Sequence, residues 1–410
     1  MHLKSQFVVL ACAVISTMIL CGCASENEVA GGSARDIVDW HAAREQGRRA
    51  IAEGRFDDAA AAYRRAIELA DTTEDPEYFR IMSLNGLGEV YRHQGDLSQA
   101  ATHYKEALEL KVQTTTPFDL GLGRDYTNLA THMLHAGRLD EAEEANQDAL
   151  EIFELHHGGD HPDIGMTLNN LGMVAWMRGD PTTAEERMTR ASEILEASEL
   201  ARHSDTASLL SNLAQVKLQL LKYDEAESLT RKAIDIWTEN HGTPSLPVAR
   251  GSNSLGEILR RQGRLDDALL TYRRSLEMME AHLGSADPEV ATVLNNLALV
   301  QRRQERLTEA EASYLRAAQI LEEAYGGMHA DLGATLFNLG RLYAAQERFV
   351  EAEPQFQRAL EIYERATGGS HPNVAMVLRG YAEMLRAVGR DSEANPLVQR
   401  ADRIMAGTES

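Results

Sequence analysis

A leucine followed by a small residue recurs every 42 residues along most of the chain. The positions of this leucine are Leu87, Leu129, Leu171, Leu213, Leu255, Leu297, Leu339 and, occupied by tyrosine, Tyr381. An alanine stands thirteen residues after each of them, from Ala100 to Ala394. An earlier unit, with Gly47, Ala59 and Tyr63 at the matching places, is offset by 41 residues. This periodicity predicts an array of nine structural repeats.

Each repeat has the apolar pattern of two helices. In the sixth repeat, Leu294, Leu297 and Ala298 fall on one helical face, a polar turn follows at residues 304–307, and a second apolar stripe passes through Tyr314. Glycine inside a helix costs about 1 kcal/mol relative to alanine. Its recurrence after the leucine therefore predicts that the paired helices cross closely, and the fold class is expected to be all-α.

The second helices carry a start signal in several repeats. Asp224 with Glu227, and Thr308 with Glu311, have the spacing of a capping box. In that motif the glutamate side chain reaches back to the backbone N–H at the start of its own helix. We therefore expect these glutamates to cap the helices that contain them.

The repeat unit resembles the tetratricopeptide repeat. The matching residues in one unit are Leu87, Gly88, Tyr91, Gly95, Ala100, Tyr104 and Ala107. The 42-residue period and the Gly-Gly-x-His linkers near residues 158–162, 326–329 and 368–372 resemble the kinesin-light-chain-like subgroup. The resemblance implies a right-handed α-solenoid of about nine helix–turn–helix repeats over residues 37–406. It also implies a concave groove, lined by the first helices, that binds peptides or other proteins and carries out no chemistry.

The beginning of the chain has the pattern of a secretory signal. Its apolar run, residues 7–20, is shorter than the roughly 20 residues that a membrane-spanning helix needs. The sequence Leu-Cys-Gly-Cys ending at Cys23 resembles a bacterial lipobox, which implies cleavage before Cys23 and lipid on its thiol. Residues 1–22 are expected to be a lipoprotein signal peptide and residues 23–36 a flexible tether. An ordinary signal or an uncleaved anchor is the alternative.

The predicted lipid also predicts a location. Several acyl chains together give stable attachment to a membrane. Ala24, rather than an aspartate, follows the modified cysteine. In lipoproteins of this kind that implies sorting to the outer membrane. The bacterial cell envelope is therefore the expected location, with the periplasmic face of the outer membrane favoured over the inner membrane.

Charge and motifs narrow the function classes. The chain has 41 basic and 63 acidic residues, a formal charge of −22, which argues against nucleic-acid binding. The sequence contains no glycine-rich phosphate loop and no nucleophile elbow. The repeats also leave little chain for a catalytic domain. We therefore expect no enzyme, no catalytic residue and no cofactor.

Histidines near residue 160 are candidate metal ligands. His156, His157 and His161 lie close together around Asp160. The last histidine of this group, however, recurs at the same repeat position as His203, His329 and His371. A ligand has no reason to recur without its partners, so a role in the turn is favoured and no metal site is expected.

An asparagine precedes the repeated leucine in five repeats. These residues are Asn128, Asn170, Asn212, Asn296 and Asn338. A carboxamide offers a donor and an acceptor to a peptide backbone, and in related tetratricopeptide grooves an asparagine at this place holds an extended ligand. The alternative is that these side chains bridge neighbouring first helices.

The residues after the leucine predict a groove with two parts. The apolar part is formed by Met173, Trp176 and Met177. The cationic part is formed by Arg250, Arg260, Arg261, Arg302 and Arg303. Guanidinium groups match carboxylates, so an acidic extended segment is the expected ligand. The alternative is that these arginines pair with acidic neighbours along the solenoid.

These expectations combine into one function: a lipid-anchored scaffold that binds an extended, acidic segment of a partner protein. The alternative is an accessory subunit of a cell-wall or polysaccharide export assembly. A sugar site needs aromatic platforms, whereas Trp40, Trp176 and Trp237 are far apart in the sequence. This separation favours the scaffold.

Overall fold

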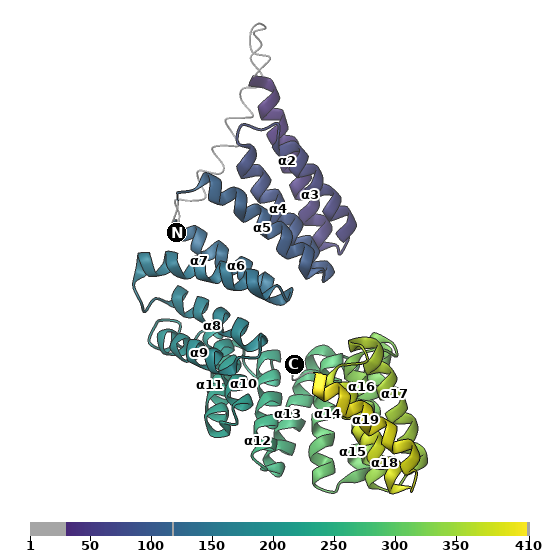
Figure 1. Ribbon diagram of the computed structural model, residues 1–410. Coiled ribbons are helices and arrows are strands. Elements are labelled where there is room, and N and C mark those ends of the chain that lie inside the picture. Colours follow the sequence, from purple (N-terminus) through teal and green to yellow (C-terminus); the bar gives the residue numbers. More distant parts are fainter. Residues whose placement is uncertain (1–29, 117–118, 408–410) are drawn as a thin grey trace. The chain divides into compact units, whose positions relative to one another are not determined.

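The computed structural model describes residues 30–116 and 119–407, and all regular structure in these ranges is helical. The eighteen helices α2 to α19 form helix–turn–helix hairpins there (Figure 1). The predicted all-α fold class, and the α-solenoid that the family resemblance implies, are therefore confirmed. The predicted signal peptide, residues 1–22, and the predicted lipid attachment site, Cys23, lie outside the described residues.

The hairpins belong to two compact units, the N-terminal unit (residues 1–156) and the C-terminal unit (residues 157–410). The first six helices are α2 (Ala30–Ala52), α3 (Phe56–Ala70), α4 (Pro76–Gln94), α5 (Leu97–Thr114), α6 (Leu120–His135) and α7 (Leu139–His157). The helices of the C-terminal unit are α8 (Pro162–Met177), α9 (Pro181–Glu196), α10 (Ser204–Gln219), α11 (Tyr223–His241), α12 (Leu246–Arg261), α13 (Leu265–Leu283), α14 (Pro288–Arg303), α15 (Leu307–Tyr325), α16 (Ala330–Ala345), α17 (Phe349–Thr367), α18 (Pro372–Ala387) and α19 (Asp391–Gly407).

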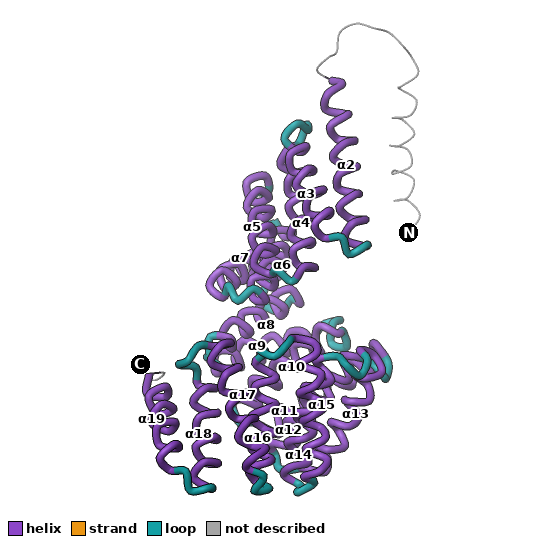
Figure 2. Tube along the Cα trace, turned by 90° about the vertical axis from the view of Figure 1, so that its right-hand side faces the viewer, coloured by secondary structure: helices purple, strands orange, loops and turns teal. Residues whose placement is uncertain are grey.

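Within each unit the hairpins stack in chain order. A second helix typically packs against its own first helix and also against the first helix of the next hairpin, as α13 does against α12 and α14. First helices touch their successors more lightly, as α14 touches α16. Figure 2 shows the helices from α8 to α19 as consecutive pairs joined by short loops.

The small residue after the leucine lets the two helices of a hairpin approach closely. A Cβ atom at Gly256 of α12 would lie 2.7 Å from the Tyr272 ring of α13. A Cβ atom at Gly172 of α8 would lie 2.6 Å from the Met188 side chain of α9. Both distances are shorter than a carbon–carbon contact tolerates, so the close crossing predicted from the sequence is confirmed at these positions.

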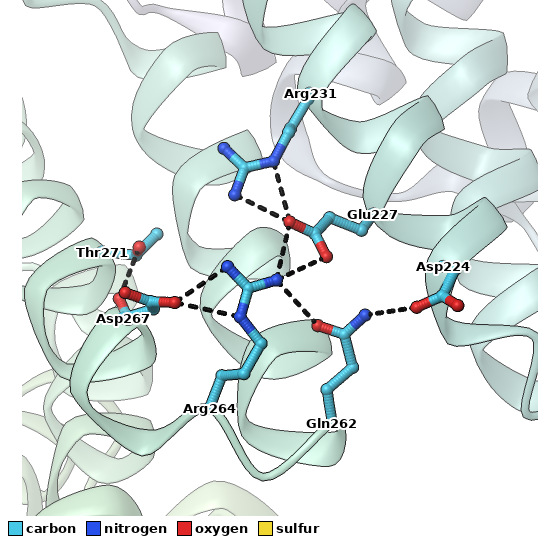
Figure 3. A network of polar contacts seen from close by, with 7 residues as sticks. All are labelled: Asp224, Glu227, Arg231, Gln262, Arg264, Asp267 and Thr271. Carbon is cyan, nitrogen blue, oxygen red and sulfur yellow. Dashed lines mark hydrogen bonds and ion pairs between the residues drawn. The ribbon is translucent and has the colours of Figure 1, made fainter.

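A basic residue in the turn of a hairpin links it to the preceding hairpin. Arg264 Nη1 donates to Glu227 Oε2 over 2.8 Å, and Arg264 Nε donates to Asp267 Oδ2 over 2.9 Å (Figure 3). The first contact reaches back 37 residues, into the previous repeat. The same step joins Lys222 to Glu185, Arg348 to Glu311 and Arg390 to Glu353. Ion pairs thus connect successive hairpins along one edge of the stack.

These ion pairs correct the expectation that the glutamates cap their own helices. Glu227 and Glu311 accept hydrogen bonds from arginines of the next repeat. Their helices, α11 and α15, begin at Tyr223 and Leu307 and have no side-chain cap. Each glutamate is therefore the fifth residue of its helix, which is too far along to reach back to the first turn.

The start of the array also differs from the expectation. α2 begins at Ala30, within the stretch 23–36 that was expected to be a tether. Hydrophobic periodicity marks only the part of a helix that packs against other helices, so it does not reveal this extension. Among the helices of the described ranges, none combines the length and the apolar character needed to cross a membrane.

Candidate binding faces of the two units

The asparagines before the repeated leucines lie on first helices, and two of them connect neighbouring first helices. Asn296 of α14 donates through Nδ2 to Asn253 Oδ1 of α12 over 3.2 Å. Asn338 of α16 donates through Nδ2 to Asn295 Oδ1 of α14, also over 3.2 Å. For these two side chains the structure has the bridging arrangement, and a role in holding a ligand stays a prediction.

The other three asparagines of this set are half-buried or exposed on their helices. They are Asn128, Asn170 and Asn212. Asn128 lines a cavity of the N-terminal unit. Ligand binding by these three also stays a prediction.

The residues of the predicted apolar part differ in exposure. Met173 and Trp176 are half-buried and pack against the core formed by α9 and α10. Trp176 Nε1 also donates to Gln219 Oε1 over 2.6 Å. Met177 is exposed. Two of the three side chains therefore contribute to the core, which leaves Met177 as the most accessible of them.

Three of the predicted cationic residues form internal ion pairs. Arg250 of α12 donates from Nε and Nη2 to both oxygens of Glu289, over 2.7 and 2.6 Å. Arg260 and Arg261 both donate to Glu257, one helical turn before them. For these three arginines the structure contains the alternative arrangement, in which they pair with acidic neighbours. Each has a carboxylate within reach, either on its own helix or on the first helix of the next hairpin.

The Glu257 carboxylate is held in its charged form. Burial raises the pKa of this carboxyl, but the hydrogen bonds from Arg260 and Arg261 outweigh burial and hold the pKa below its ordinary value. The Tyr272 hydroxyl donates to the same carboxylate over 3.3 Å. Glu257 therefore offsets one of the two positive charges and occupies hydrogen-bond donors of both guanidinium groups.

Arg302 differs from these paired arginines. It lines a cavity of about 270 Å³, here called the arginine cavity, between residues of α14, α16, α17 and α18. Its Nε atom is buried without a hydrogen-bond partner. Across the described residues, no carboxylate forms an ion pair with Arg302. Arg303, the next residue, is exposed.

Arg341 of α16, which is not among the residues predicted from the sequence, also lines the arginine cavity. Its guanidinium carbon lies 5.8 Å from the centre of the Phe337 ring. Within the part of the chain that the structure describes, it too has no ion pair with a carboxylate. The cationic residues predicted from the sequence stand about five residues after the repeated leucine, whereas Arg341 is the second residue after Leu339. Glu383 of α18 also lines this cavity.

The N-terminal unit contains a larger cavity, of about 900 Å³, between residues of α2 to α6. The rings of Tyr104 and His132 stack in its wall, with centroids 4.2 Å apart. Burial, with help from His135 and Arg92, lowers the pKa of His132 and keeps its imidazole neutral near pH 7. The charged lining residues of both signs are Arg44, Arg48, Arg92, Lys111, Asp75, Glu77, Glu89 and Asp125. This mixture does not favour one charge class of ligand.

The linker histidines act as helix caps, as the turn role predicted. His161 Nδ1 accepts a hydrogen bond from the backbone N–H of Asp163 over 3.2 Å. The same contact recurs at His203, His329 and His371. One metal-ligand arrangement is nevertheless present, because ligand atoms of His157, His161 and Asp163 lie within 4.8 Å of one another. A cation there would sit at the N-terminus of α8, where the helix dipole opposes positive charge.

The repeats match a known family. The tetratricopeptide repeat family matches residues 40–111, 126–197, 205–281, 289–365 and 342–405. The chain belongs to the tetratricopeptide repeat family. Tetratricopeptide repeats are interaction modules, so this tetratricopeptide repeat protein is, in broad terms, a scaffold for protein–protein interaction.

A curated relative agrees with the kinesin-light-chain-like character of the repeats. Protein KINESIN LIGHT CHAIN-RELATED 1 of Arabidopsis thaliana is 30% identical over 106 residues. The match covers 25% of this chain and 17% of the relative, so the chain spans a small part of that protein. The similarity therefore concerns the repeats.

Solved structures of other proteins have a similar fold. The apo form of the quorum sensor NprR from B. thuringiensis has a TM-score of 0.52 and 16% identity, and covers 98% of this chain and 95% of its own. A Rap protein complexed with Competence and Sporulation Factor has a TM-score of 0.51 and 16% identity, with 80% and 98% covered. At these identities the likeness shows the fold alone.

Proposed function

We propose that this tetratricopeptide repeat protein is a lipid-anchored scaffold that binds an extended, acidic segment of a partner protein at the bacterial cell envelope. The binding part rests on one observation: Arg302 and Arg341 line the arginine cavity, and no carboxylate of the described chain, Glu383 of the same cavity included, forms an ion pair with either of them. In a chain of net charge −22, such a cavity is a local exception. Guanidinium groups pair with carboxylates through two parallel hydrogen bonds.

A neighbouring cavity supports an extended ligand with apolar side chains beside its acidic ones. This cavity, of about 450 Å³, shares Arg341 and Glu383 with the arginine cavity and adds Phe337 and Met376. Apolar surface next to a cation fits a segment in which an acidic residue lies close to an apolar residue. We therefore place the ligand across α14, α16 and α18.

The fold of a solved protein supports a binding role for stacked hairpins. The Rap protein of similar fold was solved in complex with Competence and Sporulation Factor. The chemistry of the partner proposed here rests on the two cavities of this chain and on no property of the Rap protein.

The binding proposal is tested with a library of extended peptides on the full chain purified in detergent. We expect the selected peptides to be enriched in aspartate and glutamate, and to bind more weakly when these are changed to asparagine and glutamine. Selection of neutral or basic peptides would overturn the acidic ligand. If glycan fragments bind and no peptide does, the polysaccharide-assembly alternative replaces the scaffold.

The lipid anchor is proposed from the sequence alone, and its attachment site, Cys23, lies outside the described residues. Cells fed an alkyne fatty acid should label the wild-type chain and leave Cys23→Ala unlabelled, because the thiol and the new N-terminus carry the acyl chains. Cys21→Ala is the matched control and should keep its label. Label on the Cys23→Ala chain, or wild-type protein that fractionates away from membranes, would contradict the anchor.

A further inference from the structure

In one repeat of the C-terminal unit, a tyrosine, a glutamate and an arginine form a hydrogen-bonded trio. The Tyr272 hydroxyl donates to Glu257 Oε2 over 3.3 Å. Arg260 donates to both oxygens of the same carboxylate, over 2.7 Å from Nε and 2.5 Å from Nη2. Tyr272 is fully buried. The carboxylate of Glu257 thus satisfies a buried phenol and a half-buried guanidinium at once.

The next repeat keeps the phenol and the guanidinium but has no carboxylate between them. The residues 42 positions further along the chain are Tyr314, Leu299 and Arg302. The Tyr314 hydroxyl and the Arg302 Nε atom are both buried, and neither has a hydrogen-bond partner. Unsatisfied buried polar groups are costly to a fold, and a ligand that supplies the missing acceptor removes this cost.

A second cation lies beside this incomplete trio. Arg341 occupies the position of Leu299 one repeat further on and lines the arginine cavity together with Arg302. Burial raises the pKa of Tyr314 to about 12, against the influence of Arg302, Arg341 and Arg260. The hydroxyl therefore stays protonated and keeps a proton to donate. Its neighbours are positive, which favours an anionic acceptor.

We propose that Tyr314, Arg302 and Arg341 form a carboxylate subsite, in which a carboxylate of the bound segment accepts the hydrogen bonds that Glu257 accepts in the preceding repeat. This inference rests on the proposed function, and it assigns the acidic contact of the ligand to one position. The carboxylate accepts hydrogen bonds from the tyrosine hydroxyl and the two guanidinium groups. It comes from an aspartate or glutamate side chain, or from the C-terminus of the segment.

The cavity favours a single negative charge. Glu383 of α18 lines it as well, and a doubly charged phosphate would lie close to this carboxylate in a small space. Three peptide probes distinguish the sources: an internal glutamate with an amidated C-terminus, a free C-terminus without acidic side chains, and a phosphoserine. Tighter binding of either carboxylate probe supports the subsite, and tightest binding of the phosphoserine probe overturns it.

The decisive variant restores the missing carboxylate from within the chain. In Leu299→Glu the new side chain stands where Glu257 stands one repeat earlier, so it should occupy the subsite. Leu299→Gln is the matched neutral variant. We expect the acidic peptide to bind Leu299→Glu at least about tenfold more weakly than Leu299→Gln, because a charged pair is lost to the ligand. Equal affinity for the two variants would overturn the subsite.

Thermal unfolding of the same two variants tests the subsite without any ligand. An internal carboxylate that finds the Tyr314 hydroxyl and Arg302 should give Leu299→Glu a higher Tm than Leu299→Gln. A Tm that is no higher overturns the subsite whatever the peptides do. If no peptide binds the wild-type chain, the proposed function fails, and this comparison still decides whether the position accepts a carboxylate.

A further pair of variants separates the subsite from the packing of its tyrosine. Tyr314→Phe removes a hydroxyl that has no partner, so its Tm should stay close to that of the wild type while acidic peptides bind about tenfold more weakly. Tyr272→Phe removes a hydroxyl that is bonded to Glu257 and should leave peptide affinity unchanged. Weaker binding in both variants, or in neither, would overturn the assignment of Tyr314.

Discussion

At Gly256 the absence of a side chain sets the distance between two helices. Its position against the Tyr272 ring also fixes where the tyrosine hydroxyl meets Glu257. Gly340 faces Phe356 with more room, because a Cβ atom there would lie 3.3 Å from the ring rather than 2.7 Å. The same repeat position therefore tolerates a methyl group differently in different hairpins.

Gly256→Ala is expected to destabilise the chain, because the overpacking cost of about 1–3 kcal/mol exceeds the gain in helix propensity. Gly340→Ala should be close to neutral, since the looser contact is offset by about 1 kcal/mol of helix propensity. Urea unfolding followed by circular dichroism measures both. Equal losses at the two positions would show that ring contact is not what selects glycine.

The sequence was sufficient to predict that these small residues lie where helices cross closely. It was not sufficient to predict which arginines form internal ion pairs. Arg260 and Arg261 stand three and four residues after Glu257, the spacings at which side chains of one helix meet, so this pairing could have been predicted from the sequence. The pairing of Arg250 with Glu289 depends on the register of two first helices, which no local pattern contains. Arg341 was missed because its importance depends on what stands at the same position in other repeats.

Between elements, stacking is reinforced by the turn residues. Arg138, at the turn before α7, donates to the Glu141 carboxylate over 2.6 and 2.7 Å. Lys105 of the preceding second helix, α5, donates to the same carboxylate over 2.7 Å. These hydrogen bonds from Arg138 and Lys105 lower the pKa of Glu141 to about 2. One carboxylate thus joins two hairpins of the N-terminal unit.

The depressed pKa of Glu141 predicts a pH dependence. Its contribution to stability is complete above the ordinary glutamate pKa near 4.5 and is lost as the pH falls towards 2, where the folded chain also takes up the proton. The Tm difference between the wild type and Glu141→Gln should therefore shrink over this range. Glu154→Gln, on an exposed position of α7, is the control. A difference that stays constant with pH would contradict the ion pair.

The period of 42 residues was sufficient to predict the hairpins but not their grouping. Buried leucines and small residues recur in phase through both units, because each hairpin meets the same local packing demand. The division at residues 156 and 157 does not interrupt that phase. Sequence periodicity reflects the packing inside each hairpin. It does not indicate how many successive hairpins form one compact unit.

For the molecule as a whole, net charge and local charge oppose each other. The chain carries −22, so an acidic ligand is repelled at long range. The arginine cavity attracts the same ligand only once it is near. Salt screens both interactions over a distance of about 10 Å at 0.1 M.

We therefore expect the association rate of an acidic peptide to rise when salt is added to a low-salt buffer, since long-range repulsion is screened first. Its dissociation rate should rise as well, because the arginine contacts weaken. Stopped-flow fluorescence measures the two rates, with the glutamine-substituted peptide as the control. An association rate that falls with added salt would mean that the local arginines, rather than the net charge, steer the encounter.

The fixed steps between repeats have an evolutionary consequence. Turn ion pairs recur at 37 residues and asparagine pairs at 43 residues, so several hairpins of the C-terminal unit make the same contacts with the hairpins before and after them. Recombination that deletes one repeat from the gene would leave flanking hairpins able to join. If the deleted repeat held Leu299 and Tyr314, the shortened protein would keep its architecture and lose its preference for acidic segments. Length and ligand choice are thus separately heritable traits of such an array.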